Sequence, residues 1–147
     1  MDQNKNMKKI EIKKIDIGLM SDPNIAEPVI KLNDYDLKIL FPVNNFVRKD
    51  EIKQGIIKFM NCSAFRVGSP NDEGFALSDN EIWNNKNFEH IDWDNMYEVY
   101  GVPSAYYNQF YKNSDQSIER HNLKHFVFFM KEATFECLAE SFENLSK

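Results

Sequence analysis

Apolar and polar positions alternate through much of the N-terminal third of the chain, which is the pattern of strands with one buried face. Over residues 10–19 isoleucine or leucine recurs at every second position, apart from a slip at Lys13-Lys14. This stretch therefore predicts a bulged strand or two short strands. Residues 29–32 and 37–41 alternate in the same way on either side of Asn33-Asp34, which predicts a β-hairpin.

Longer apolar stretches predict strands deeper in the protein. Residues 52–67 predict either one long bulged strand or a pair of short ones, and residues 97–100 predict a further short strand. Residues 126–130 are apolar at every position, which is typical of a central strand that is buried on both faces.

Two stretches carry a helical pattern. Residues 103–113 begin with a proline, which suits a first helical turn, and their aromatic side chains share one face at helical spacing. Residues 134–145 admit two interpretations. As a helix they present one apolar stripe, and as a strand they set Phe135, Cys137 and Ala139 on one face, in position to pair with residues 126–130. The pattern alone favours the helix.

These elements predict an α+β fold, which is mainly an antiparallel sheet curled into a sandwich or partial barrel with one or two short helices. Strands that come in adjacent pairs disfavour a wound α/β sheet, in which they would alternate with helices. We expect one globular domain over residues 1–147, with a frayed polar terminus at residues 1–8, because this length suits a single domain.

The composition of the chain disfavours several classes of partner and location. The formal net charge is −5, which disfavours a nucleic-acid partner, since phosphate binding needs a clustered basic surface. No apolar stretch resembles a signal peptide or a membrane span, so we expect a cytoplasmic protein without a membrane partner. Cys62 and Cys137 are too few for a disulfide framework. Their apolar neighbours predict small buried residues with raised thiol pKa values.

The charge is concentrated in one segment, residues 69–98, where eight carboxylates oppose Lys86 alone and give a net charge of −7. Aromatic side chains lie between these acids, and such residues are enriched where proteins bind one another. A ring of acids also speeds association with a basic protein. The predicted partner-binding residues are Asp79, Glu81, Trp83, Glu89, Asp92, Trp93 and Asp94.

Two motifs resemble those of a group of small uncharacterised bacterial proteins. One is the Gly-x-Pro-Asn-Asp-Glu turn at residues 68–73, and the other is the late His-Phe-x-Phe…Thr-Phe-Glu-x-x-Ala segment at residues 125–139. The group has no activity to transfer. The resemblance implies a C-terminal hairpin with a loop at Glu132-Ala133, which would set Phe128 opposite Cys137 and His125 opposite Glu140.

Candidate chemistry is sparse. Asp72 and Glu73 are adjacent carboxylates that could act as a general base or bind a divalent ion, with His125 or Glu136 brought near by the fold. No spacing predicts a metal site, and no cofactor is expected. The first hypothesis is therefore a non-catalytic protein-binding module, such as a toxin-neutralising immunity protein. A small metal-dependent or acid/base hydrolase and a small-ligand-binding β-domain remain as alternatives, and the oligomeric state stays open.

Overall fold

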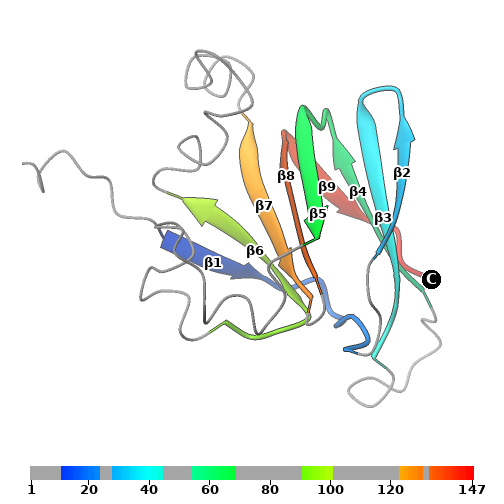
Figure 1. The fold of residues 1–147 in the computed structure, drawn as a ribbon, viewed down its shortest axis with the longest axis vertical. Coiled ribbons are helices and arrows are strands. Elements are labelled where there is room, and N and C mark those ends of the chain that lie inside the picture. The colour runs from blue at the N-terminus through cyan, green and yellow to red at the C-terminus, as the bar shows by residue number, and fades with distance from the viewer. Residues whose placement is uncertain (1–10, 24–27, 45–53, 69–90, 101–122, 131–132) are drawn as a thin grey trace, which may run out of the picture.

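The structure, a computed structural model, describes residues 11–23, 28–44, 54–68, 91–100, 123–130 and 133–147 (Figure 1). These residues form nine β-strands and no helix. The strands are β1 (Glu11–Ile15), β2 (Val29–Asn33), β3 (Asp36–Pro42), β4 (Gln54–Met60), β5 (Ala64–Gly68), β6 (Asn95–Tyr100), β7 (Lys124–Phe129), β8 (Thr134–Ala139) and β9 (Ser141–Asn144).

The strands make two antiparallel sheets. One has five strands in the order β1-β6-β7-β8-β5, and the other has four in the order β2-β3-β4-β9. Figure 1 shows the five-stranded sheet on the left and the four-stranded sheet on the right. The chain passes between the sheets twice at one corner, from β4 to β5 through residues 61–63 and from β8 to β9 through Glu140.

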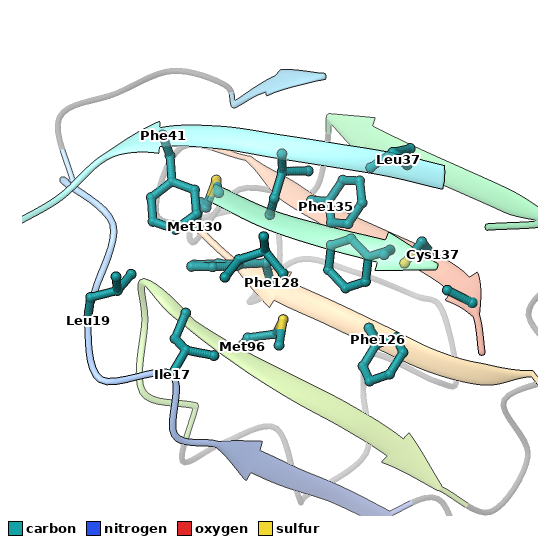
Figure 2. Close-up of a cluster of buried hydrophobic side chains, with 14 of the residues drawn as sticks. Ile17, Leu19, Leu37, Phe41, Met96, Phe126, Phe128, Met130, Phe135 and Cys137 are labelled. Carbon is teal, nitrogen blue, oxygen red and sulfur yellow. The ribbon is translucent and has the colours of Figure 1, made fainter. Parts of the chain in front are cut away.

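The main core lies between the sheets and is filled by aromatic rings (Figure 2). Phe41 of β3 meets Phe128 of β7 edge to face, with ring centroids 5.0 Å apart. Phe59 of β4 lies 5.5 Å from Phe126, measured between ring centroids. Gly55 lies directly opposite Phe41 on β4, and a Cβ atom there would collide with the Phe41 ring, so glycine is what allows this close approach.

A second apolar cluster lies on the outward side of the five-stranded sheet. Its buried members come from the three central strands of that sheet: Tyr97, Val99, Val127, Phe129 and Leu138. Because β7 and β8 are thus buried on both sides, nearly every position in them is inaccessible to solvent. This explains the unbroken apolar run of β7, which was predicted to be a central strand.

The predicted α+β class is wrong for the described residues, which are all-β. The antiparallel strands themselves are confirmed, including the hairpin of β2 and β3. The stretch predicted as one bulged strand or a pair of short ones contains two strands in its described part, β4 and β5, which belong to different sheets. The helix predicted at residues 103–113 lies outside the described residues.

The helical interpretation of residues 134–145 is also wrong, because these residues form β8 and β9. Strand β8 is buried on both faces, so apolar residues occupy both of its sides and happen to fall at helical spacing. The hairpin of β7 and β8 exists, but its register differs from the one implied by the resemblance. Phe128 lies opposite Phe135, and His125 lies opposite Leu138.

Candidate functional site

Two of the weak catalytic candidates meet on the outward side of the five-stranded sheet. His125 of β7 and Glu136 of β8 are joined by a contact of 3.1 Å between Nε2 and Oε1. Both side chains are almost fully buried, with 0% and 1% exposure. The other oxygen of Glu136 lies 4.0 Å from Nη1 of Arg66, which stands directly opposite Glu136 on β5.

The register explains why these three side chains converge. Val127 pairs with Glu136 and His125 with Leu138, so His125 and Glu136 are diagonal neighbours on one face of the hairpin. Burial of a carboxylate is unfavourable unless it is paired and hydrogen-bonded, and here the imidazole and the guanidinium partly enclose it. The sequence marked His125 and Glu136 separately but contained no signal that Arg66 would join them.

Burial limits the chemistry of this cluster. A general base must come within hydrogen-bond reach of the proton that it abstracts. His125 Nδ1 and the Glu136 carboxylate are both shielded from solvent. The geometry therefore supports a role in specifying the sheet more directly than a role in acid–base catalysis. Asp72 and Glu73 lie outside the described residues, so the hydrolase hypothesis that combines all four residues stays a prediction.

Three of the predicted partner-binding residues lie in the turn that leads into β6. Asp92 points outward and forms an ion pair with Lys14 of β1, with 2.6 Å between Oδ2 and Nζ. This hydrogen bond raises the pKa of Lys14 above its ordinary value. Asp92 keeps about half of its side chain exposed, at 52%. It is therefore the most exposed of the three predicted residues in this turn.

Trp93 and Asp94 hold the turn in place. The Trp93 ring packs edge to face on Phe129, with centroids 6.2 Å apart. Asp94 is buried with a positive φ of 66°, and its Oδ1 accepts a 2.9 Å hydrogen bond from the Ser21 hydroxyl. Its backbone N–H donates to the Phe129 carbonyl at 2.6 Å. The remaining predicted residues, Asp79, Glu81, Trp83 and Glu89, lie outside the described residues.

A surface that the sequence interpretation missed is the hairpin of β2 and β3. Strand β2 is an edge strand, paired with β3 alone among the described strands. Three of the four large apolar side chains that are exposed among the described residues belong to this hairpin: Val29 at 57%, Leu32 at 63% and Tyr35 at 76%. Alternating apolar and polar residues predict such a strand, but they do not predict how exposed its side chains are. That exposure depends on the place of the strand at the edge of the sheet.

The outward side of the four-stranded sheet carries two rows of side chains in register, and we call it the open face. One row is apolar, with Val29, Leu40 and Ile56 on neighbouring strands. The other row is charged, and its members are Lys31, Lys38, Lys58 and Glu143. The hairpin was predicted to turn at Asn33-Asp34, whereas the turn in the structure lies at residues 34–35 and sets Lys31 opposite Lys38.

No three His, Cys, Asp or Glu side chains in the described ranges converge as the ligands of a metal ion would. The described part of the chain also has no helix with the length and apolar character needed to cross a membrane.

Comparison of the chain with models of known protein families, with curated proteins and with solved structures gives no match. The resemblance of residues 68–73 and 125–139 to a bacterial group therefore stays a prediction.

Proposed function

We propose that this protein is a non-catalytic protein-binding module and that the hairpin of β2 and β3 forms its contact surface. The observation that carries the proposal is the exposure of Val29, Leu32 and Tyr35 on one edge hairpin. Exposed apolar side chains that gather on one element mark interaction sites more often than scattered ones do. Tyrosine is among the residues that dominate binding energy in interfaces.

The edge position adds a specific mode of binding. The outer edge of β2 offers backbone N–H and C=O groups to which an extended segment of a partner can add as a further strand. The side chains of β2 then select the partner, because Leu32 and Lys31 lie on opposite sides of the strand. An apolar residue beside Leu32 and a carboxylate beside Lys31 would complement this strand.

The experiment compares partner capture by matched surface variants. Wild-type protein is used to capture partners from its native source, and the affinity of the captured protein is then measured for L32S, Y35S and F65S. Phe65 is the matched control, because it is the fourth large apolar residue exposed in the described ranges but lies on β5, at the edge of the other sheet. We expect L32S and Y35S to weaken binding by about tenfold or more and F65S to leave it unchanged.

Unchanged affinity in both hairpin variants would overturn the assignment of this surface. Equal losses in all three variants would have the same meaning, since they would indicate a general effect of surface apolarity. Because all three positions are solvent-exposed, the variants should retain the wild-type fold, and circular dichroism checks this directly.

A second candidate function is the neutralisation of a basic partner, as in a toxin-neutralising immunity protein. It is favoured by the exposed Asp92 carboxylate within the acidic segment at residues 69–98. Trp93→Ala is a poor test of it, because Trp93 packs on Phe129. Asp92→Asn is better, with Lys14→Gln as the control that removes the same ion pair but keeps the carboxylate. A steering role predicts slower, less salt-dependent association for D92N only.

A further inference from the structure

Strand β2 bonds to β3 through alternate residues, and the residues between them face outward. The backbone groups of successive residues in a strand point to its two sides in turn. On β4, the Ile56 carbonyl accepts a hydrogen bond of 2.8 Å from the Leu145 N–H, on the side away from β3. The neighbours of Ile56 along β4 therefore bond to β3, and the register carries this alternation across to β2. The residues of β2 that bond to β3 are then Val29, Lys31 and Asn33.

The N–H and C=O groups of Ile30 and Leu32 consequently face the outer edge of β2. Among the described residues, no strand pairs with that edge. Pro28, two residues before Ile30, has no N–H to donate, which ends the edge on one side. The turn at residues 34–35 ends it on the other side. An added strand therefore finds one short stretch of backbone to bond with, and Lys31 is at its centre.

The side chain at this centre is the end of the charged row on the open face. Lys31 is exposed and stands opposite Lys38, which stands opposite Lys58 on the next strand. Neighbouring strands lie about 4.8 Å apart, so three positive charges follow one another at that spacing. The acids lie at the far end of the row, since Glu143 stands opposite Lys58 and Asp36 Oδ2 is 3.6 Å from Lys58 Nζ. The end of the row at the open edge is therefore positive.

We propose that the edge of β2 binds an extended segment whose side chains alternate as apolar, acidic, apolar, with the carboxylate opposite Lys31. This inference names the partner chemistry of the hairpin, so it rests on the proposed function. In antiparallel addition, the residues opposite Ile30 and Leu32 exchange backbone hydrogen bonds with them, and the residue between lies beside Lys31 on the open face. A carboxylate there forms an opposite-charge pair across the strands. The apolar residues on the other side cover Leu32, which is 63% exposed.

The same row disfavours a second copy of this chain as the occupant. Two β2 strands that pair antiparallel through Ile30 and Leu32 of both copies set the two Lys31 side chains directly opposite each other. Like charges in this position are destabilising, and lysines on edge strands are one means by which proteins prevent such pairing. Charge complementarity therefore favours an acidic partner over self-association.

The test is an NMR titration of the isotope-labelled wild-type protein with three capped peptides. Their sequence is Gly-Ser-Thr-Val-X-Val-Thr-Ser-Gly, in which X is Glu, Gln or Lys. We expect the Glu peptide to bind about threefold more tightly than the Gln peptide and about tenfold more tightly than the Lys peptide, with the largest amide shifts at Ile30 and Leu32. The net charge of −5 on the chain opposes this order, so the order reports the local row of lysines.

Two variants and a modified peptide separate the parts of the proposal. Lys31→Glu should reverse the order, so that the Lys peptide binds most tightly. The matched control is Lys13→Glu, which makes the same change of charge at an exposed position of β1, an edge strand of the five-stranded sheet, and should keep the order. N-methyl groups on both valines of the Glu peptide remove the donors to the β2 carbonyls and should abolish binding.

Equal affinity of the wild-type protein for the three peptides would overturn the inference, as would an unchanged order in K31E. Full binding of the N-methylated peptide, or no binding at about 2 mM peptide, would overturn it too. A dimer of the free protein in which the Ile30 and Leu32 amides are protected from exchange would overturn the choice of occupant. None of these results affects the proposed function if L32S and Y35S weaken binding of the captured partner. Unchanged partner affinity in both hairpin variants would overturn the proposed function itself.

Discussion

The outward sides of the two sheets differ sharply, although both sheets share the same inner core. On the five-stranded sheet this side is buried and consists of apolar residues around the His125–Glu136 pair, and we call it the buried face. On the four-stranded sheet it is the open face, where lysines stand abreast. Alternation along a strand therefore has different consequences in the two sheets, because the outward side chains are exposed to water in only one of them.

The difference between the two faces also separates residues that stabilise the fold from residues that are available to bind a partner. A charged group on the buried face must find its partners inside the protein, and Glu136 does so with His125 and Arg66. A lysine on the open face needs no such partner and can meet another molecule. We therefore expect substitutions on the buried face to change stability, and substitutions on the hairpin beside the open face to change binding.

The largest expected effect comes from removing the carboxylate on the buried face. Glu136→Ala leaves His125 buried without its acid, and breaking a buried pair by removing one partner destabilises a protein by about 3–5 kcal/mol. The measurement is the free energy of unfolding from urea denaturation. The matched control is Glu143→Ala on the exposed strand β9, for which we expect a change below about 0.5 kcal/mol.

Equal losses of stability in E136A and E143A would contradict the expected difference between the buried face and the open face. A small loss of unfolding free energy in E136A would mean that the contact between the Glu136 carboxylate and His125 contributes little to stability. Activity measurements are not needed for this test, because it concerns only the stability of the sheet.

Much of the sheet structure could be predicted from local patterns. The β2–β3 hairpin follows from alternation around a short turn, and the apolar run of β7 indicates a strand buried on both faces. Burial on both faces explains why β7 was correctly predicted as a strand, and it also explains why the α-helical interpretation of residues 134–145 was wrong. Strand β8 is buried on both sides, and an apolar sequence without a period-two pattern fits a helix equally well.

What local patterns do not contain is the pairing of distant strands. The approach of Arg66 to Glu136, for example, depends on β5 lying beside β8. The predicted strand or strand pair at residues 52–67 gave no reason to place β4 and β5 in different sheets. The sequence therefore identified His125 and Glu136 as candidate residues, but it did not predict that their side chains would be in contact.

A smaller effect is expected from matched truncations of leucine on the two faces. Leu138 is fully buried on the buried face, and Leu138→Ala should destabilise the protein by about 2–5 kcal/mol. Leu40 lies on the open face and is only half-buried, so Leu40→Ala should cost about 1 kcal/mol. Urea denaturation of both variants measures the difference. A loss in L40A as large as that in L138A would show that the open face is packed against something in solution.

The smallest expected effect concerns the charges of the open face. Lys38 stands directly between Lys31 and Lys58 on neighbouring strands, and like charges in this position are destabilising. Asp36 relieves Lys58 only partly, at 3.6 Å between Oδ2 and Nζ. Lys38→Glu should therefore raise the free energy of unfolding by about 0.5–1 kcal/mol, since it replaces two repulsive pairs with attractive ones.

Two controls make this small effect interpretable. Lys38→Gln removes the repulsion without adding attraction, and it should give about half the gain. Lys13 of β1 stands opposite Glu98 on β6, so Lys13→Glu should lower stability by a similar amount. All three effects should shrink in 0.5 M salt, where exposed charges are screened within about 4–5 Å. If K38E lowers stability instead, the lysines are held apart by partners on the open face, and the row is then part of the folded structure rather than a surface left free to bind.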